Sequence, residues 1–129
     1  MINKNKINIL LVEDEAIIAL GQKTQLEDYN YNVHIVHSGE KAIEYIQQND
    51  IIDLMLMDIN LGKGIDGTET AMEILKYKNL PIVFLTSYTS KEIVEKTEKV
   101  TSYGYVVKQS GIDVLHASIS IALKLFKSS

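Results

Sequence analysis

Short continuous apolar runs, separated by stretches with helical patterning, are the feature that most constrains the fold of this chain. Such runs are typical of parallel strands that are buried on both faces of a sheet. Right-handed crossovers between parallel strands place helices on both of those faces. We therefore expect an α/β fold in which five parallel strands form one doubly wound sheet with five helices. The expected strands are Ile7–Val12, Asn32–Val36, Asp53–Met57, Ile82–Leu85 (opened by Pro81) and Tyr103–Val107.

The intervening segments carry helical patterning and helix-start signals. The expected helices span 15–28, 40–48, 66–77, 91–100 and 112–126. Ser38 is the expected N-cap of the second helix. The apolar residues of the first helix predict a broad buried face, formed by Ile17, Ile18, Ala19, Leu20 and Leu26.

The last expected helix is apolar on more than one side. One stripe is formed by Ile112, Leu115, Ile119, Ala122 and Phe126, and a second by Val114, Ala117, Ile121 and Leu125. A helix with two apolar stripes buries more than one face. The second stripe either packs into a deep groove on the sheet or forms a surface for a partner or a second copy. The sequence leaves both alternatives open.

The composition excludes several classes of function. The 129 residues carry a formal net charge of -4, whereas a nucleic-acid-binding surface is basic. No cysteine is present, so disulfides and thiolate metal sites are excluded. No apolar stretch reaches membrane-spanning length. His34 and His37 are three positions apart, and on a strand such residues point to opposite faces, which argues against a shared metal site. A cytoplasmic domain without nucleic-acid or membrane partners is expected.

Polar side chains follow the apolar runs where four of the expected strands end. In an open parallel sheet, ligands bind in the crevice beyond the carboxyl ends of the strands. The sequence therefore predicts one pocket that contains three carboxylates, hydroxyl groups and an ammonium. The residues concerned are Glu13, Asp14, Asp58, Thr86, Ser87 and Lys108.

The predicted pocket suits phosphoryl chemistry. Glu13, Asp14 and Asp58 would repel one another in a partly dry crevice unless a cation lay among them. Oxygen ligands without His or Cys favour a hard ion, and Mg²⁺ needs only one or two carboxylates plus water and phosphate oxygens. Lys108 and Thr86 supply a cation and a hydrogen-bond donor for phosphoryl oxygens. The only nucleophile at the strand ends is a carboxylate, which would give an aspartyl phosphate.

The same strand ends resemble those of a receiver domain of two-component response regulators, of the chemotaxis-regulator type. The resemblance implies a flavodoxin-like sheet with strand order 2-1-3-4-5. It also implies a single receiver domain over 1–129, with its core at about 7–126. It covers essentially the whole chain and is carried by Glu13-Asp14, Leu56-Met57-Asp58-Ile59-Asn60, Thr86-Ser87 and Gly104-Tyr105-Val106-Val107-Lys108.

The resemblance implies a role for each matching residue. Asp58 would accept a phosphoryl group from the phosphohistidine of a sensor histidine kinase. Mg²⁺ would be held by Glu13, Asp14 and Asp58, together with the backbone carbonyl of Asn60. Lys108 would pair with Asp58 at rest and with the phosphoryl group after transfer. The chain would then be a signalling phosphoacceptor that assists its own phosphorylation and dephosphorylation, rather than an enzyme.

The resemblance also implies residues for switching and for the lifetime of the phosphoryl group. Thr86 and Ser87 would bind phosphoryl oxygens, and Tyr105 would follow Thr86 by rotating inward. Asn60 and Tyr88 would tune the phosphoryl lifetime. The surface formed by strand five and the last helix would engage an output domain or a second copy.

The chain departs from the family pattern at two turns. Gln109 stands where a proline usually follows the strand-five lysine, and without proline a cis bond would cost about 3 kcal/mol. We expect a trans or a strained bond between Lys108 and Gln109. The turn Gly62-Lys63-Gly64 is longer than the simplest family pattern and has Gly62 where a proline is common. Similar turns occur in receivers attached to sensor kinases. We expect the chain to be either a stand-alone receiver or one cut from a longer protein, a hybrid sensor histidine kinase or a regulator.

Two other functions compete with phosphoacceptance. A Mg²⁺-dependent nucleotidyl-transfer domain of the topoisomerase–primase type also has a glutamate after one strand and an Asp-x-Asp after another. Here the second acid is Asn60, and Thr86 and Lys108 would have no role. A degenerate receiver that binds partners without phosphorylation is suggested by Gln109 alone, since all the acidic positions and the lysine are intact.

Overall fold

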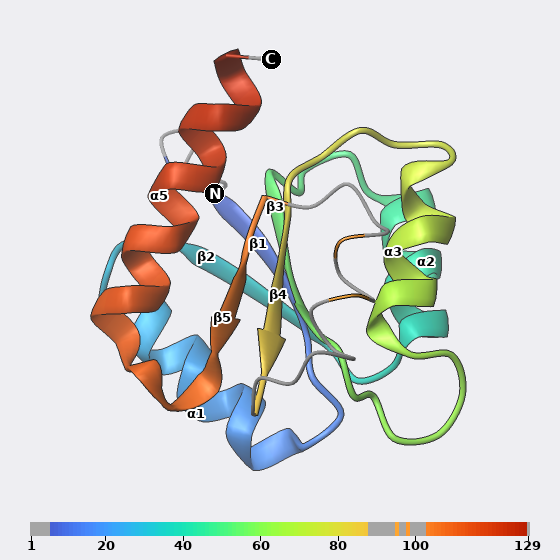
Figure 1. Ribbon diagram of the computed structural model, residues 1–129, viewed down its shortest axis with the longest axis horizontal. Helices are drawn as coiled ribbons and strands as arrows, with labels where there is room; N and C mark the ends of the chain where they lie inside the picture. Colours follow the sequence, from blue (N-terminus) through green and yellow to red (C-terminus); the bar gives the residue numbers. More distant parts are fainter. Residues whose placement is uncertain (1–5, 88–94, 96–97, 99–102, 129) are drawn as a thin grey trace.

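The computed structural model describes residues 6–87, 95, 98 and 103–128. Its centre is one parallel sheet of five strands in the order β2-β1-β3-β4-β5, which confirms the expected topology (Figure 1). The strands are β1 Asn8–Val12, β2 Asn32–Val36, β3 Leu54–Asp58, β4 Ile82–Thr86 and β5 Tyr105–Val107.

Helices cover both faces of the sheet, with α1 and α5 on one side and α2 and α3 on the other (Figure 1). The described part of the chain contains four α-helices: α1 Ala16–Glu27, α2 Gly39–Gln48, α3 Gly67–Leu75 and α5 Ile112–Ser128. A short 3₁₀ helix, η1 Lys108–Ser110, joins β5 to α5. The fifth helix expected over 91–100 falls almost entirely outside the described residues and stays a prediction. Among the described helices, none is both long and apolar enough to cross a membrane.

The sheet separates two hydrophobic cores. Ile9 and Leu11 of β1 pack on the side of α1 and α5, whereas Leu10 and Val12 pack on the side of α2 and α3. All five residues of β1 are buried. Successive side chains of a strand point to opposite faces, so a strand covered on both sides has to be apolar throughout. This geometry explains the continuous apolar runs of the sequence.

The broad buried face predicted for α1 is wrong. Only Ala19 and Leu26 are buried, whereas Ile17 is 88% exposed, Leu20 62% and Ile18 39%. The physical reason is that consecutive helical residues are about 100° apart, so 17–20 cannot all face the sheet. Ala19 and Leu26 lie seven positions apart and share one face, which α1 packs on the core.

The helix-start signals of the sequence are confirmed. Ser38 is the N-cap of α2, and its Oγ accepts a hydrogen bond from the Lys41 backbone N–H at 3.1 Å. Asp66 caps α3 in a reciprocal capping box with Glu69. The boundaries differ by at most two residues: β3 extends to Asp58, α3 ends at Leu75, β5 begins at Tyr105 and α5 continues to Ser128.

The structure resolves the two stripes of α5. The buried residues of this helix are Leu115, Ile119 and Ala122, which belong to the first stripe. The second stripe faces outward, with Val114 47%, Ile121 56% and Leu125 53% exposed. The second stripe therefore does not pack into a groove on the sheet, and it leaves an apolar surface on α5.

Candidate functional site

The predicted pocket forms at the carboxyl edge of the sheet. Asp58 is the last residue of β3 and Thr86 the last residue of β4, while Glu13 and Lys108 directly follow β1 and β5. Because these four strands are parallel neighbours, their ends meet at one edge. The pocket encloses about 280 Å³ and is lined by Asp14, Glu15, Asp58, Asn60, Gly62, Ser87 and Lys108.

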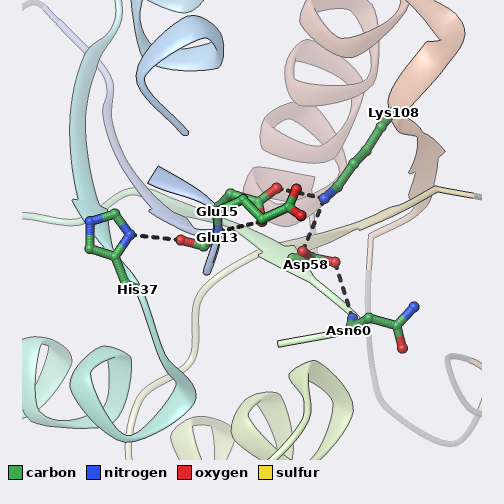
Figure 2. A network of polar contacts seen from close by, with 6 residues as sticks. All are labelled: Glu13, Glu15, His37, Asp58, Asn60 and Lys108. Atoms are coloured by element: carbon green, nitrogen blue, oxygen red, sulfur yellow. Dashed lines mark hydrogen bonds and ion pairs between the residues drawn. The ribbon is translucent and has the colours of Figure 1, made fainter. Parts of the chain in front are cut away.

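Lys108 bridges two buried carboxylates (Figure 2). Its Nζ lies 2.5 Å from Oε1 of Glu13 and 3.0 Å from Oδ2 of Asp58. Glu13 is fully buried and Asp58 is 4% exposed. The remaining oxygens accept backbone hydrogen bonds, Glu13 Oε2 from Glu15 N at 3.2 Å and Asp58 Oδ1 from Asn60 N at 3.0 Å. Every carboxylate oxygen of this pair therefore has a hydrogen-bond donor.

The single ammonium of Lys108 does not neutralise the charges of the two buried carboxylates equally. Burial raises the pKa of Asp58 to about 7, and the nearby Glu13 adds to the increase, against the opposing effect of Lys108. Burial also opposes ionisation of Glu13, but the hydrogen bonds from Lys108 and the Glu15 backbone hold the pKa of Glu13 below its usual value. Desolvation of Lys108 is likewise outweighed by its two carboxylate partners, which raise its pKa. Asp58 is thus the group whose charge is least stabilised at rest.

The site fits a hard divalent cation. One carboxylate oxygen from each of Glu13, Asp14 and Asp58 lies within 4.8 Å of the other two. Burial, together with the charge of Glu13, raises the pKa of Asp14, as expected where carboxylates crowd without a counter-ion. All three ligands are oxygens and Asp14 is exposed at the mouth of the pocket, which matches the preference of Mg²⁺ for a few carboxylates plus water.

Comparison with known proteins assigns the family. Residues 9–120 match the response regulator receiver domain. The chain belongs to this family. It is 30% identical over 120 residues to the transcriptional regulatory protein PdtaR of Mycobacterium tuberculosis, and 34% identical over 120 residues to the uncharacterized transcriptional regulatory protein YrkP of Bacillus subtilis. Each match covers 92% of the chain but only 58% of PdtaR and 50% of YrkP, so the receiver spans about half the length of these relatives.

Solved receiver domains share the fold. The N-terminal domain of a response regulator/sensory box/GGDEF 3-domain protein from Carboxydothermus hydrogenoformans is 42% identical, with a TM-score of 0.87 over 94% of this chain and 97% of that one. A CheY-like receiver domain protein from Methanospirillum hungatei is 25% identical, with a TM-score of 0.86 over 96% and 98%. These similarities confirm the chemotaxis-regulator type of receiver expected from the sequence.

The residues predicted to act as a switch, Thr86 and Tyr105, lie at the end of β4 and at the start of β5. Thr86 is fully buried, whereas Ser87 is exposed and lines the pocket. Tyr105, the first residue of β5, has an exposed side chain (41%). Tyr88 lies outside the described residues, so its role in the phosphoryl lifetime stays a prediction.

Gln109 does not distort the backbone of the receiver. The Lys108–Gln109 bond is trans, as are the other peptide bonds of the described residues. Gln109 continues into η1, which leads to α5 through Gly111. The absence of proline is therefore accommodated by a trans bond, one of the two outcomes expected from the sequence, and Lys108 still reaches both carboxylates.

Sequence reasoning missed one supporting residue of the site. His37 Nδ1 lies 2.9 Å from the Glu13 carbonyl oxygen and donates a hydrogen bond to it, since a carbonyl only accepts (Figure 2). The Glu13 N–H also donates to Val36 O at 3.1 Å. The end of β2 therefore holds the turn that carries Glu13 and Asp14. The pairing of β2 with β1 could have pointed to His37, because residues that follow neighbouring parallel strands lie side by side.

Proposed function

We propose that this receiver domain accepts a phosphoryl group on Asp58, with Mg²⁺ in the pocket, and thereby switches the surface that it offers to a partner. The observation that carries this proposal is the bridge of Lys108 between Glu13 and Asp58 next to Asp14. A carboxylate at the bottom of a pocket, beside an ammonium and a cluster of oxygen ligands, is a phosphoryl acceptor site in chemical terms.

The transfer follows from the roles of the side chains. A carboxylate oxygen of Asp58 attacks the phosphorus of a phosphohistidine, the new P–O bond forms as the P–N bond breaks, and the imidazole leaves with the electron pair and takes up a proton. Bound Mg²⁺ supplies charge neutralisation for the phosphoryl oxygens. Lys108 remains within reach of the modified Asp58 and pairs with the phosphoryl oxygens, while Thr86 and Ser87 donate hydrogen bonds to them. Tyr105 then rotates inward beside Thr86, and Asn60 and Tyr88 set the lifetime.

Receiver domains are signalling domains of two-component systems. For this chain, we propose a sensor histidine kinase as the phosphodonor, docking over α1. Ile17, Ile18 and Leu20 are exposed there, and the first two line a groove of about 640 Å³ that extends to Ser87 and Lys108. Apolar side chains beside a charged site are typical of surfaces that bind another protein. The groove would place the donor phosphohistidine next to Asp58.

The output side is proposed on β5 and α5. Tyr105 at the start of β5 is 41% exposed, and the outward stripe of α5, which includes Ile121 and Leu125, is exposed and apolar. A second copy of the receiver or an output domain would bind there. Since the chain spans about half of its curated relatives, an attached output domain or a hybrid kinase is compatible with this arrangement.

The decisive experiment is phosphorylation with a small donor. After incubation with acetyl phosphate and Mg²⁺, intact-mass spectrometry should detect a phosphoryl adduct in the wild type and none in Asp58→Asn. Omitting Mg²⁺ should abolish the adduct as well. If the wild type gave no adduct and bound no beryllofluoride, the chain would be a receiver that works without phosphorylation.

A further inference from the structure

The loop between β3 and α3 (residues 59–66, the β3–α3 loop) shapes the proposed metal site. It starts directly after Asp58, and its Asn60 and Gly62 line the pocket. The loop is anchored at both ends, because Gly67 N donates to Ile59 O at 2.9 Å and Asp66 caps α3. Its path between these anchors decides where Asn60 and Gly62 lie relative to the carboxylates.

The middle of this loop has little intrinsic rigidity. Gly62 and Gly64 adopt positive φ angles of 68° and 89°, and residues 62–64 are exposed. Glycine has more conformational freedom to lose on folding than any other residue, and the loop contains no proline. Leu61 is buried in the core beneath α2 and α3 and holds the first half of the loop, whereas the exposed residues 62–64 depend on contacts from outside the loop.

Glu40 provides such a contact from the first turn of α2. Its Oε2 accepts a hydrogen bond from the Ile65 backbone N–H at 3.2 Å, across 25 positions of sequence. The same carboxylate lies against Gly64, where a Cβ would be only 2.7 Å from Oε2 and 2.9 Å from Oε1. The neighbouring Gly39 fits so tightly against α3 that a Cβ there would overlap Thr70 Oγ1. This close packing fixes the start of α2, and with it the origin of the Glu40 side chain.

The opposite side of the loop contacts the metal-site carboxylates. A Cβ on Gly62 would lie 2.9 Å from Asp14 Oδ2, so the backbone passes directly beside Asp14. The segment 62–65 is therefore held between two carboxylates, Asp14 of the proposed metal site and Glu40 of α2. Ile65 is only three positions from Gly62, so the contact with Glu40 lies close along the chain to the contact with Asp14.

We infer that Glu40 is a positioning residue for the metal site: by accepting the Ile65 N–H, it holds the β3–α3 loop in the path that places Asn60 and Gly62 beside Asp14 and Asp58. This inference rests on the proposed Mg²⁺ site and adds to it a residue outside the pocket. Loss of the contact increases the freedom of the loop in the metal-free protein, so Mg²⁺ binding then has to order the loop at a cost in affinity.

The test is a titration with Mg²⁺ alone, without phosphodonor, followed by calorimetry and by amide NMR of Asn60 and Gly62. Glu40→Ala should weaken Mg²⁺ binding roughly three- to tenfold, the range expected for one hydrogen bond to a backbone amide. Glu40→Gln keeps a side-chain acceptor and should recover most of the affinity. Glu44→Ala is the matched control, since Glu44 is an exposed acid on the same helix that pairs with Lys41 at 3.7 Å. It should bind Mg²⁺ like the wild type.

The variants separate positioning from simple charge. If Glu40 acted only through its negative charge, Glu40→Gln would lose as much affinity as Glu40→Ala. That result would overturn the inference, as would wild-type affinity in Glu40→Ala. Hydrogen exchange at the Ile65 amide should become faster in Glu40→Ala, whereas exchange in the β3 core stays unchanged. Failure of the proposed function looks different, because it is the absence of a phosphoryl adduct on Asp58 in the wild type at saturating Mg²⁺.

Discussion

At the scale of single residues, the main feature of the site is that one ammonium, Lys108, neutralises the charges of two acids unequally. Lys108 lies closer to Glu13 than to Asp58, and Glu13 is the more deeply buried of the two. Glu13 keeps its charge, while the charge of Asp58 is poorly compensated. A bound cation would stabilise the poorly compensated charge of Asp58, so the resting arrangement suits the phosphoryl transfer that we propose.

The elevated pKa of Asp58 predicts a pH-dependent stability in Mg²⁺-free buffer. A carboxyl group whose pKa rises from 3.8 to about 7 on folding binds more protons in the folded state, so the free energy of unfolding falls as pH increases between these values. Asp58→Asn removes this effect. Urea denaturation should show the variant to be more stable than the wild type at pH 8, by about 1–4 kcal/mol, with little difference at pH 4. A difference between the two proteins that does not depend on pH would contradict the assignment.

Glu13, Asp14, Asp58 and Lys108 were predictable from the sequence because each lies within two positions of the end of an apolar run, and the topology brings the ends of these runs together. Glu40 was not predictable in the same way. Its contact with Ile65 depends on how α2 packs against a loop that lies 25 positions further along the chain. No local pattern marks an exposed glutamate in a first helical turn as different from an ordinary one.

At the scale of elements, an aromatic cluster holds α5 against the turn between α1 and β2. The rings of Tyr29 and His116 stack at 4.1 Å between centroids, and Tyr31 Oη lies 2.8 Å from His116 Nδ1. The Tyr29 hydroxyl also donates to Asp113. These contacts connect the N-terminal half of α5 to the turn between α1 and β2. The proposed output helix is therefore anchored on the far side of the sheet from α2 and α3.

Removal of the His116 ring should loosen this anchor. His116→Ala should lower the free energy of unfolding by about 1–2 kcal/mol, because it loses both the ring stacking and the hydrogen bond with Tyr31. Val114→Ala on the same helix is the control, since that side chain is 47% exposed, and it should change stability by less than about 0.5 kcal/mol. Equal midpoints of urea denaturation for His116→Ala and wild type would show that the aromatic cluster does not contribute to the free energy of unfolding.

Elements differed in how well the sequence predicted them. The central strands were identified because burial on both faces demands continuous apolar residues, and β2 was expected with its observed boundaries. The exposed face of α1 was missed because a list of apolar residues does not show which side of a helix meets the sheet. Ile17 and Leu20 lie outside the core, so the role proposed for them is binding rather than packing.

At the scale of the whole molecule, exposed apolar residues lie both on α1, where we propose that the phosphodonor docks, and on α5, where we propose that the output binds. The α1 groove extends to Lys108, while the outward stripe of α5 contributes Ile121 and Leu125. Asp58 lies at the carboxyl edge of the sheet. The two apolar surfaces can therefore be altered separately by substitution.

That separation predicts a selective defect in phosphotransfer. With a histidine kinase that phosphorylates the wild type, Ile17→Ser should slow transfer about tenfold, since an apolar contact in an interface contributes on the order of 1–2 kcal/mol. Labelling by acetyl phosphate should stay normal, because the pocket is unchanged. Ile121→Ser, the same substitution at another exposed isoleucine, should leave both reactions intact. If Ile17→Ser slowed phosphorylation by the kinase and by acetyl phosphate equally, the substitution would act on the pocket itself, and the proposed docking surface on α1 would be wrong.

The alternation of β3 between two cores has a consequence for spectroscopy. Met55 and Met57 point to the core beneath α2 and α3, whereas Leu54 and Leu56 point to the core beneath α1 and α5. Methyl groups of two different amino acids, on one strand that ends at Asp58, therefore sample opposite halves of the molecule. Selective isotope labelling of methionine and leucine would record how a change at Asp58 is distributed between these halves, without any added probe.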